Sequence, residues 1–174
     1  MKLVVMRSVA FLFAFVLLLS STGFCAPQSL MSEQDKQTIL QQSAVQPPEN
    51  AKVSDVWLEP SDMALETRTV QASIGEYLRI VLVSPPNKNR EWQYVDDKPR
   101  FLEKLHSQQL EFSSNRSAAE QQTVSLFLFK VRNNAAGDDR LTFVQYQMSE
   151  GEKAAVSMLD IGVRYFNPEL QKKL

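Results

Sequence analysis

The chain has 174 residues, of which 44% are apolar and 22% are charged, and its formal net charge is −1. This length fits one globular domain with additional segments, and the composition is that of an ordinary folded protein. Because the net charge is close to zero, bulk electrostatics excludes strong attraction to nucleic acid or to anionic lipid.

The N-terminus has the three-part pattern of a secretory signal peptide. Two cations, Lys2 and Arg7, precede an uninterrupted apolar run at residues 9–19, and small polar residues follow at 20–26. The apolar run is shorter than the roughly 20 residues that a membrane span needs. We expect residues 1–25 to be removed, which leaves an exported protein, periplasmic or secreted, with no membrane span; a retained signal anchor is the alternative.

Cys25 is the only cysteine of the chain. The mature domain is therefore expected to contain no disulfide, although export would permit one, and its stability must come from packing. Cleavage just before Cys25 would give a lipoprotein, but Phe24 stands where that processing wants a small residue. The cleavage position and the lipidation of Cys25 stay open.

Residues 26–50 are rich in Gln, Ser and Pro and are predicted to form a tether. One short helix is expected within it, because Ser32 and Asp35 have the spacing of a capping box and two prolines follow downstream. Only Ile39 and Leu40 supply an apolar stripe. The sequence thus predicts a marginal helix, or a disordered segment, ahead of the main domain.

From residue 53 onward the apolar residues alternate at period two, which predicts β-strands. Strands are expected at residues 65–72, 77–83, 92–94, 123–131, 140–148 and 156–166, whereas residues 101–110 fit either a strand or a helical turn. In the last strand one face carries Leu159, Ile161 and Val163, and the other carries Asp160 and Arg164.

About seven strands with no convincing helix between them predict an all-β sandwich. The domain is expected to span residues 51–168, followed by a C-terminal tail at 169–174. Aromatic residues such as Phe127, Phe129 and Phe143 would each remove on the order of 150–250 Å² from water, which is enough to centre a core without cross-links.

Catalytic chemistry is poorly supplied in this chain. His106 is the only histidine, and a Ser–His–acid triad would have to rest on it in a stretch without a nucleophile-elbow sequence. The chain lacks the several His or Cys ligands that a zinc site needs and the glycine-rich stretch that a phosphate-binding loop needs. The acidic pairs at 96–97 and 138–139 are expected in solvated turns. We therefore expect no enzyme, no cofactor and no metal site.

Three stretches carry a family resemblance. They are residues 70–83 (VQASIGEYLRIVLV), 84–94 (SPPNKNREWQY) and 126–146 (LFLFKVRNNAAGDDRLTFVQY). Together they resemble the strands, the glycine-containing turns and the proline-bearing loop followed by tryptophan of the chagasin-like inhibitors of papain-type cysteine peptidases. The resemblance covers about residues 64–166 and implies an immunoglobulin-like β-sandwich without disulfides, which blocks a peptidase cleft with its end loops.

The resemblance lies in the framework, and the inhibitory loop motifs are degenerate. Where the family has Asn-Pro-Thr-Thr-Gly this chain has residues 86–90 (PNKNR), and where the family has Arg-Pro-aromatic it has residues 147–149 (QMS). The residues that the resemblance implies for partner binding are Pro86, Asn87, Lys88, Asn89, Arg90, Trp92, Gln147 and Met148.

Two functional hypotheses follow, and both take another protein as the partner, with no role for nucleic acid. In the first, loops 84–91, 113–122 and 147–153 gather at one end of the sandwich and enter the cleft of a peptidase. In the second, the chain is a structural or assembly subunit of a cell-envelope or secretion complex. The tether at 26–50 favours the second hypothesis, since a free inhibitor has no evident need for it.

Overall fold

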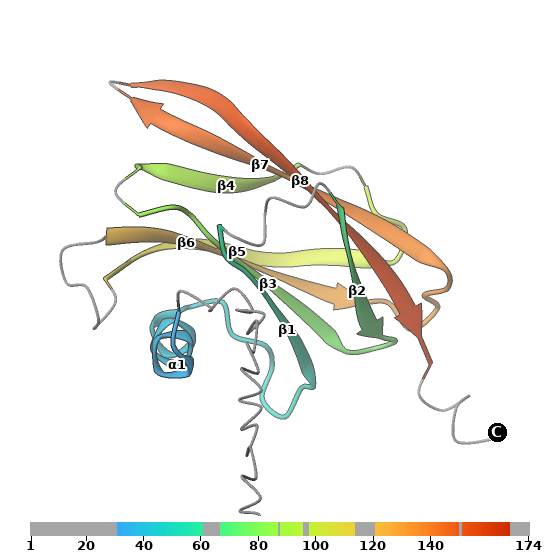
Figure 1. Ribbon diagram of the computed structural model, residues 1–174. Coiled ribbons are helices and arrows are strands. Elements are labelled where there is room, and N and C mark those ends of the chain that lie inside the picture. Colours follow the sequence, from blue (N-terminus) through green and yellow to red (C-terminus); the bar gives the residue numbers. More distant parts are fainter. Residues whose placement is uncertain are drawn as a thin grey trace, which may run out of the picture.

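The computed structural model describes residues 31–60, 67–86, 88–95, 98–113, 121–149 and 151–167. Among them, eight strands form two four-stranded sheets packed face to face, and one helix lies against the outside of one sheet (Figure 1). The predicted all-β sandwich is therefore confirmed. The predicted signal peptide with Cys25, the tail at 169–174 and the acidic pair at 96–97 lie outside the described residues.

The first sheet has the strand order β1-β3-β6-β5. Its strands are β1 (Val53–Leu58), β3 (Tyr77–Val83), β6 (Gln121–Val131) and β5 (Leu102–Ser113). β1 runs parallel to β3, and the other neighbours are antiparallel.

The second sheet has the strand order β2-β8-β7-β4. Its strands are β2 (Thr67–Ser73), β8 (Glu152–Phe166), β7 (Asp138–Ser149) and β4 (Arg90–Val95). β2 runs parallel to β8, and the other neighbours are antiparallel. Each sheet thus contains one parallel pair at an edge.

The segment at 101–110, which the sequence left ambiguous, is part of strand β5. This strand pairs with β6 along its length, and the register shifts at a bulge between Lys104 and His106. A bulge adds one residue to a strand and reverses the alternation of its side chains. Leu102 belongs to the core between the sheets, whereas Leu105 packs with the buried cluster on the outer face of the first sheet, so the two residues lie on opposite faces of the strand.

The main core lies between the two sheets. The ring centroids of Phe127 on β6 and Phe143 on β7 are 5.0 Å apart, so the aromatic pair connects the layers. On β8, Leu159, Ile161 and Val163 are buried while the intervening positions are not. The predicted faces of the last strand are therefore confirmed.

Helix α1 (Glu33–Gln42) begins at the predicted capping box. The Ser32 hydroxyl accepts a hydrogen bond from the Asp35 backbone N–H at 3.1 Å, and the Asp35 carboxylate accepts one from the Ser32 N–H at 3.2 Å. The helix ends at a C-cap, Ser43, whose N–H donates to the Ile39 carbonyl. The local start signal was thus read correctly from the sequence.

The segment predicted as a tether packs on the sandwich. Ile39 has no exposed surface and lies in a second buried cluster with apolar residues from the outer face of the first sheet, including Val81, Leu126 and Leu128. This contact also explains why β3 and β6 carry apolar residues on both faces: one face meets the second sheet and the other meets the helix. In the structure, the part of the predicted tether from Met31 to Val45 thus lies against the first sheet.

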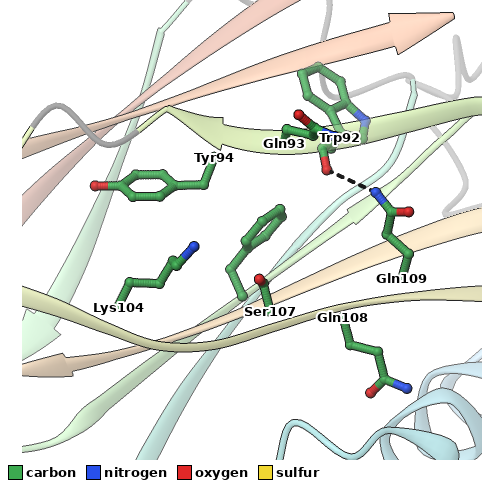
Figure 2. A pocket seen from close by; sticks show the side chains of 8 residues that line it. Trp92, Gln93, Tyr94, Lys104, Ser107, Gln108 and Gln109 are labelled. Carbon is green, nitrogen blue, oxygen red and sulfur yellow. Dashed lines mark hydrogen bonds between the residues drawn. The ribbon is translucent and has the colours of Figure 1, made fainter. Parts of the chain in front are cut away.

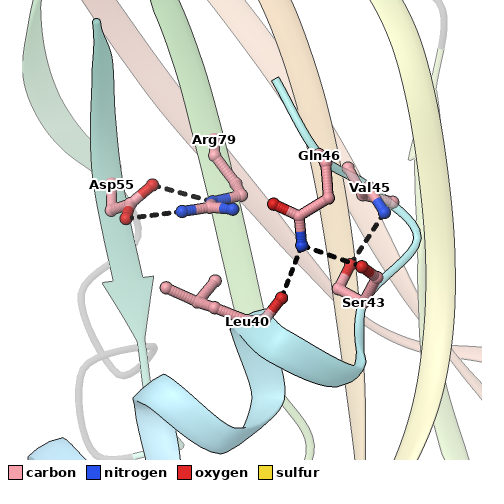
Figure 3. Close-up of polar contacts among 6 residues, drawn as sticks. All are labelled: Leu40, Ser43, Val45, Gln46, Asp55 and Arg79. Atoms are coloured by element: carbon pink, nitrogen blue, oxygen red, sulfur yellow. Dashed lines mark hydrogen bonds and ion pairs between the residues drawn. The ribbon is translucent and has the colours of Figure 1, made fainter. Parts of the chain in front are cut away.

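Polar contacts hold the helical segment in place (Figure 3). The Gln46 side-chain amide donates to the carbonyls of Leu40 and Ser43. The Gln108 side chain on β5 accepts a hydrogen bond from the Ala44 backbone N–H at 2.7 Å, which ties the end of the segment to an edge strand.

An ion pair on the same sheet lies close to the helix. The Arg79 guanidinium on β3 donates two hydrogen bonds of 2.8 Å to the Asp55 carboxylate on β1, and the Arg79 side chain is 8% exposed (Figure 3). A bidentate pair of this kind satisfies the charge of an arginine that is withdrawn from water. It joins the two parallel strands of the first sheet side by side.

Candidate functional site

The loop after β3 and the β7–β8 hairpin are bound to each other at one end of the sandwich. The Met148 backbone N–H donates to the Asn89 carbonyl at 3.0 Å, and the Asn89 side-chain amide donates to the Met148 carbonyl at 3.1 Å. The Gln147 side-chain amide also donates to the Lys88 carbonyl at 2.6 Å. These contacts bring together the two segments in which the sequence placed the candidate residues.

The ends of β5 and β6 adjoin the same region. A hollow of about 480 Å³ is lined by residues from all three segments, among them Asn89, Glu111, Thr123 and Met148. The connection between these strands, residues 114–120, lies outside the described residues. The described ends of β5 and β6 thus lie beside Asn89 and Met148.

The candidate residues differ in their exposure. Lys88 and Asn89 are exposed, while Pro86, Arg90, Gln147 and Met148 are partly buried. Asn87 lies outside the described residues. Asn89 has a φ of +38°, in the left-handed region that asparagine tolerates better than most residues. Among the described candidate residues, Lys88 and Asn89 are therefore the most open to solvent.

Trp92 is a core residue. It is 1% exposed, and its backbone N–H donates to the Ser125 hydroxyl of β6 at 3.2 Å. Its ring therefore supports the loop from within and is almost fully buried. Among the described residues, the indole N–H of Trp92 has no hydrogen-bond acceptor.

A groove between the edge strands β4 and β5 was not anticipated from the sequence (Figure 2). It has a volume of about 360 Å³, and the Lys104 amino group lies 5.6 Å from the centre of the Tyr94 ring on its opposite wall. The Gln109 amide reaches the Trp92 carbonyl at 3.5 Å across it. The described lining of the groove consists of three amides, one cation, one hydroxyl and three aromatic residues.

Asp139, expected in a solvated turn, has a structural role. Its carboxylate accepts hydrogen bonds from the backbone N–H groups of Arg100 and Phe101 and from the Tyr165 hydroxyl. Burial, together with the bond to Asp139, raises the pKa of Tyr165 well above its usual value. The neutral phenol is therefore the stable form in the folded protein.

Groups suited to metal binding or proton transfer are scarce in the described part of the chain. It contains no group of three or more His, Cys, Asp or Glu side chains that could hold a metal ion. His106 is exposed on β5. Within the same residues, no helix is both long enough and apolar enough to cross a membrane.

No family model matches the chain, and no curated protein matches it. Similar solved structures include the cysteine protease inhibitor EhICP2 from Entamoeba histolytica, at 13% identity and a TM-score of 0.44, covering 66% of this chain and 97% of that one. Amebosin is similar at 13% identity and a TM-score of 0.41, covering 63% and 96%.

PbICP-C, solved in complex with falcipain-2, is similar at 18% identity and a TM-score of 0.38, covering 66% of this chain and 99% of that one. Chagasin-like cysteine protease inhibitors are thus among the structural neighbours of the chain. At such identities and TM-scores a likeness does not assign an activity. The case for function therefore rests on the chain's own residues.

Proposed function

We propose that the chain is an exported protein-binding module that inserts its end loops into the cleft of a partner, as a chagasin-like inhibitor of a papain-type cysteine peptidase. The observation that carries the proposal is the mutual hydrogen bonding of Asn89 and Met148, which continues the pairing of β4 with β7 and fixes the end of the loop after β3 against the end of β7. A loop held in one conformation before binding loses less entropy when it enters a cleft.

The bulk of Arg90 is compatible with this mode of binding. Entry into a narrow cleft requires backbone rather than large side chains at the tip. The Arg90 Nε donates to the Gln147 side-chain oxygen at 2.9 Å, so the guanidinium is turned back onto the domain. In the described part of the loop after β3, the large charged side chain that is exposed is then Lys88.

The assembly hypothesis keeps one observation in its favour. On the second sheet, Val95 and Met158 are 41% and 63% exposed, and Val144 pairs with Met158 in the register. Apolar side chains grouped on an outer sheet face suit contact with another subunit. The argument from a free tether is weaker, because Met31, Ile39 and Val45 pack on the first sheet.

Titration of papain with the purified chain tests the proposal. Tight inhibition is expected, and replacement of residues 87–89 by alanine should abolish it. Arg132→Ala combined with Asn134→Ala, in the turn after β6 at the opposite end, is the matched control and should inhibit like the unaltered chain. If neither papain nor a papain-like peptidase of the same organism is inhibited, the inhibitor assignment fails and the assembly hypothesis leads.

Export is tested separately by cell fractionation after expression of the full-length chain. The protein should be recovered outside the cytoplasm, and its mass should correspond to an N-terminus near residue 26. Recovery of the intact chain in the cytoplasm would contradict this part of the proposal.

A further inference from the structure

A third hollow lies beside the loop after β3 and is lined by both polar and apolar residues. It has a volume of about 320 Å³ and is lined by residues that include Pro60, Pro85, Arg90, Trp92, Gln145 and Ser157. Three of these lie in one row across the second sheet, because Trp92 on β4 pairs with Gln145 on β7, and Gln145 pairs with Ser157 on β8.

This row differs from its neighbour on the same face of the sheet. The next row toward the centre, Tyr94, Phe143 and Leu159, is part of the apolar core. One step toward the loops, the buried position on β7 is held by Gln145, which is only 3% exposed. The Gln145 amide nitrogen donates to the Ser84 hydroxyl and its oxygen accepts from Arg90, each at 3.5 Å, the long limit of a hydrogen bond. A buried amide held only by such long bonds is open to a stronger polar partner.

Arg90 brings an uncompensated positive charge to the pocket. Its Nε donates to Gln147 and its Nη1 lies 3.5 Å from the Gln145 side-chain oxygen, so both partners are neutral amides. Within the described chain, Arg90 forms no ion pair. By contrast, Arg79, the other withdrawn arginine considered above, has a bidentate carboxylate. A partly buried guanidinium with donors to spare is a preferred site for an incoming anion.

The indole N–H of Trp92 supplies a second donor. It is buried and makes no hydrogen bond within the described residues. Figure 2 shows the ring turned away from Gln109 and the groove between β4 and β5. A buried donor without an acceptor is destabilising, and an acceptor brought by a ligand removes that penalty.

From these observations we propose that this pocket binds a carboxylate presented by the protein partner, with the Arg90 guanidinium and the Trp92 indole N–H as donors. The inference rests on the proposed function, since it assumes a partner at the adjoining loops. The carboxylate is that of an acidic side chain or of a chain terminus. Both have the same planar pair of oxygens, which matches the guanidinium fork.

The test uses small probes, so its outcome does not depend on papain inhibition. The ¹⁵N-labelled chain is titrated with N-acetylglutamate α-amide, which carries a side-chain carboxylate, and with N-acetylglycine, which carries a terminal one. The readout is the NMR signal of the Trp92 indole N–H. Trp57, outside this pocket, is the internal control, and Trp92→Phe assigns the signal.

A saturable shift of the Trp92 signal, with the Trp57 signal unmoved, is expected for at least one probe, and the tighter probe identifies the source of the carboxylate. Arg90→Gln should weaken binding by about tenfold or more, because a charge-assisted hydrogen bond is lost. Arg90→Lys, which keeps the charge without the fork, should weaken it less.

Three outcomes would overturn the proposal. First, neither probe could shift the Trp92 signal. Second, sodium chloride at the same ionic strength could shift the signal as much as the probes do. Third, the probes could shift the signal in both Arg90 variants as much as in the unaltered chain. If papain is inhibited but neither probe binds, the loop site stands and the pocket fails. If a probe binds but no peptidase is inhibited, the pocket stands without the inhibitor assignment.

Discussion

Replacement of Ile39 by alanine tests whether the N-terminal helix is part of the folded domain. Ile39 has no exposed surface and packs against β3 and β6, so truncation leaves a cavity between the helix and the first sheet. Core substitutions of this kind cost about 2–5 kcal/mol. Alanine is the better helix former by a few tenths of a kcal/mol, which offsets a small part of the loss. We therefore expect a net loss of about 2–4 kcal/mol.

The loss is measurable by thermal and urea denaturation followed by far-UV circular dichroism. For a domain of this size, each kcal/mol lowers Tm by about 2–5 °C, so a fall of roughly 5–15 °C is expected. Gln37→Ala is the matched control, because Gln37 is exposed on the same helix. It should change the free energy of unfolding by no more than about 0.5 kcal/mol. If Ile39→Ala and Gln37→Ala both had the same Tm as the unaltered protein, the helix would be a free tether. Our account of the first sheet would then be refuted.

Three further predictions concern stability. Ile161→Asp should lower the free energy of unfolding in urea by several kcal/mol, because it buries a charge. Asp160→Ala, on the solvent side of the same strand, should lower it by no more than about 1 kcal/mol. Equal losses in the two variants would refute the register of β8. Asp55→Ala should cost about 2–3 kcal/mol, less than the roughly 3–5 of a fully buried pair, because Arg79 loses its partner while the Asp55 side chain is 30% exposed; no loss would contradict the pairing. Because the pKa of Tyr165 is raised in the folded state, only the unfolded chain loses this proton just above about pH 10, so stability falls as pH rises there; Tyr165→Phe should show a shallower fall, and parallel curves would argue against the shift.

The strands with one solvent face were the most predictable part of the fold. In β8 the alternation of Leu159, Asp160 and Ile161 reports directly which side meets the core. Strands β3 and β6, which are covered on both faces, were predicted at the right positions. The helix that covers their outer face was not predicted to pack there. A helix whose apolar stripe rests mainly on Ile39 gives little sign that it will dock, because the decisive apolar surface lies on the sheet that receives it.

The candidate site was predictable only in outline. The sequence places Lys88, Asn89 and Met148 in loops, and the sandwich topology brings these loops together. Burial of Trp92 could not be read from its position next to a loop. Gln145, however, gave a usable signal that was overlooked: it stands in phase with Leu141 and Phe143, the buried residues of β7. A polar residue in the buried phase of a strand marks a feature that core packing alone does not explain.

The parallel pairing of β2 with β8 has a consequence for how the chain can be made. Thr67 at the start of β2 pairs with Asp160, more than 90 residues later, so the second sheet cannot close until the last strand is available. Contacts between such distant residues form slowly and leave earlier strands exposed meanwhile. A nascent chain emerging from a ribosome or a translocation pore would therefore stay incompletely folded until nearly its whole length had been released. This delay suits passage in an extended state, and it leaves β2 with an unpaired edge in any product that ends before β8.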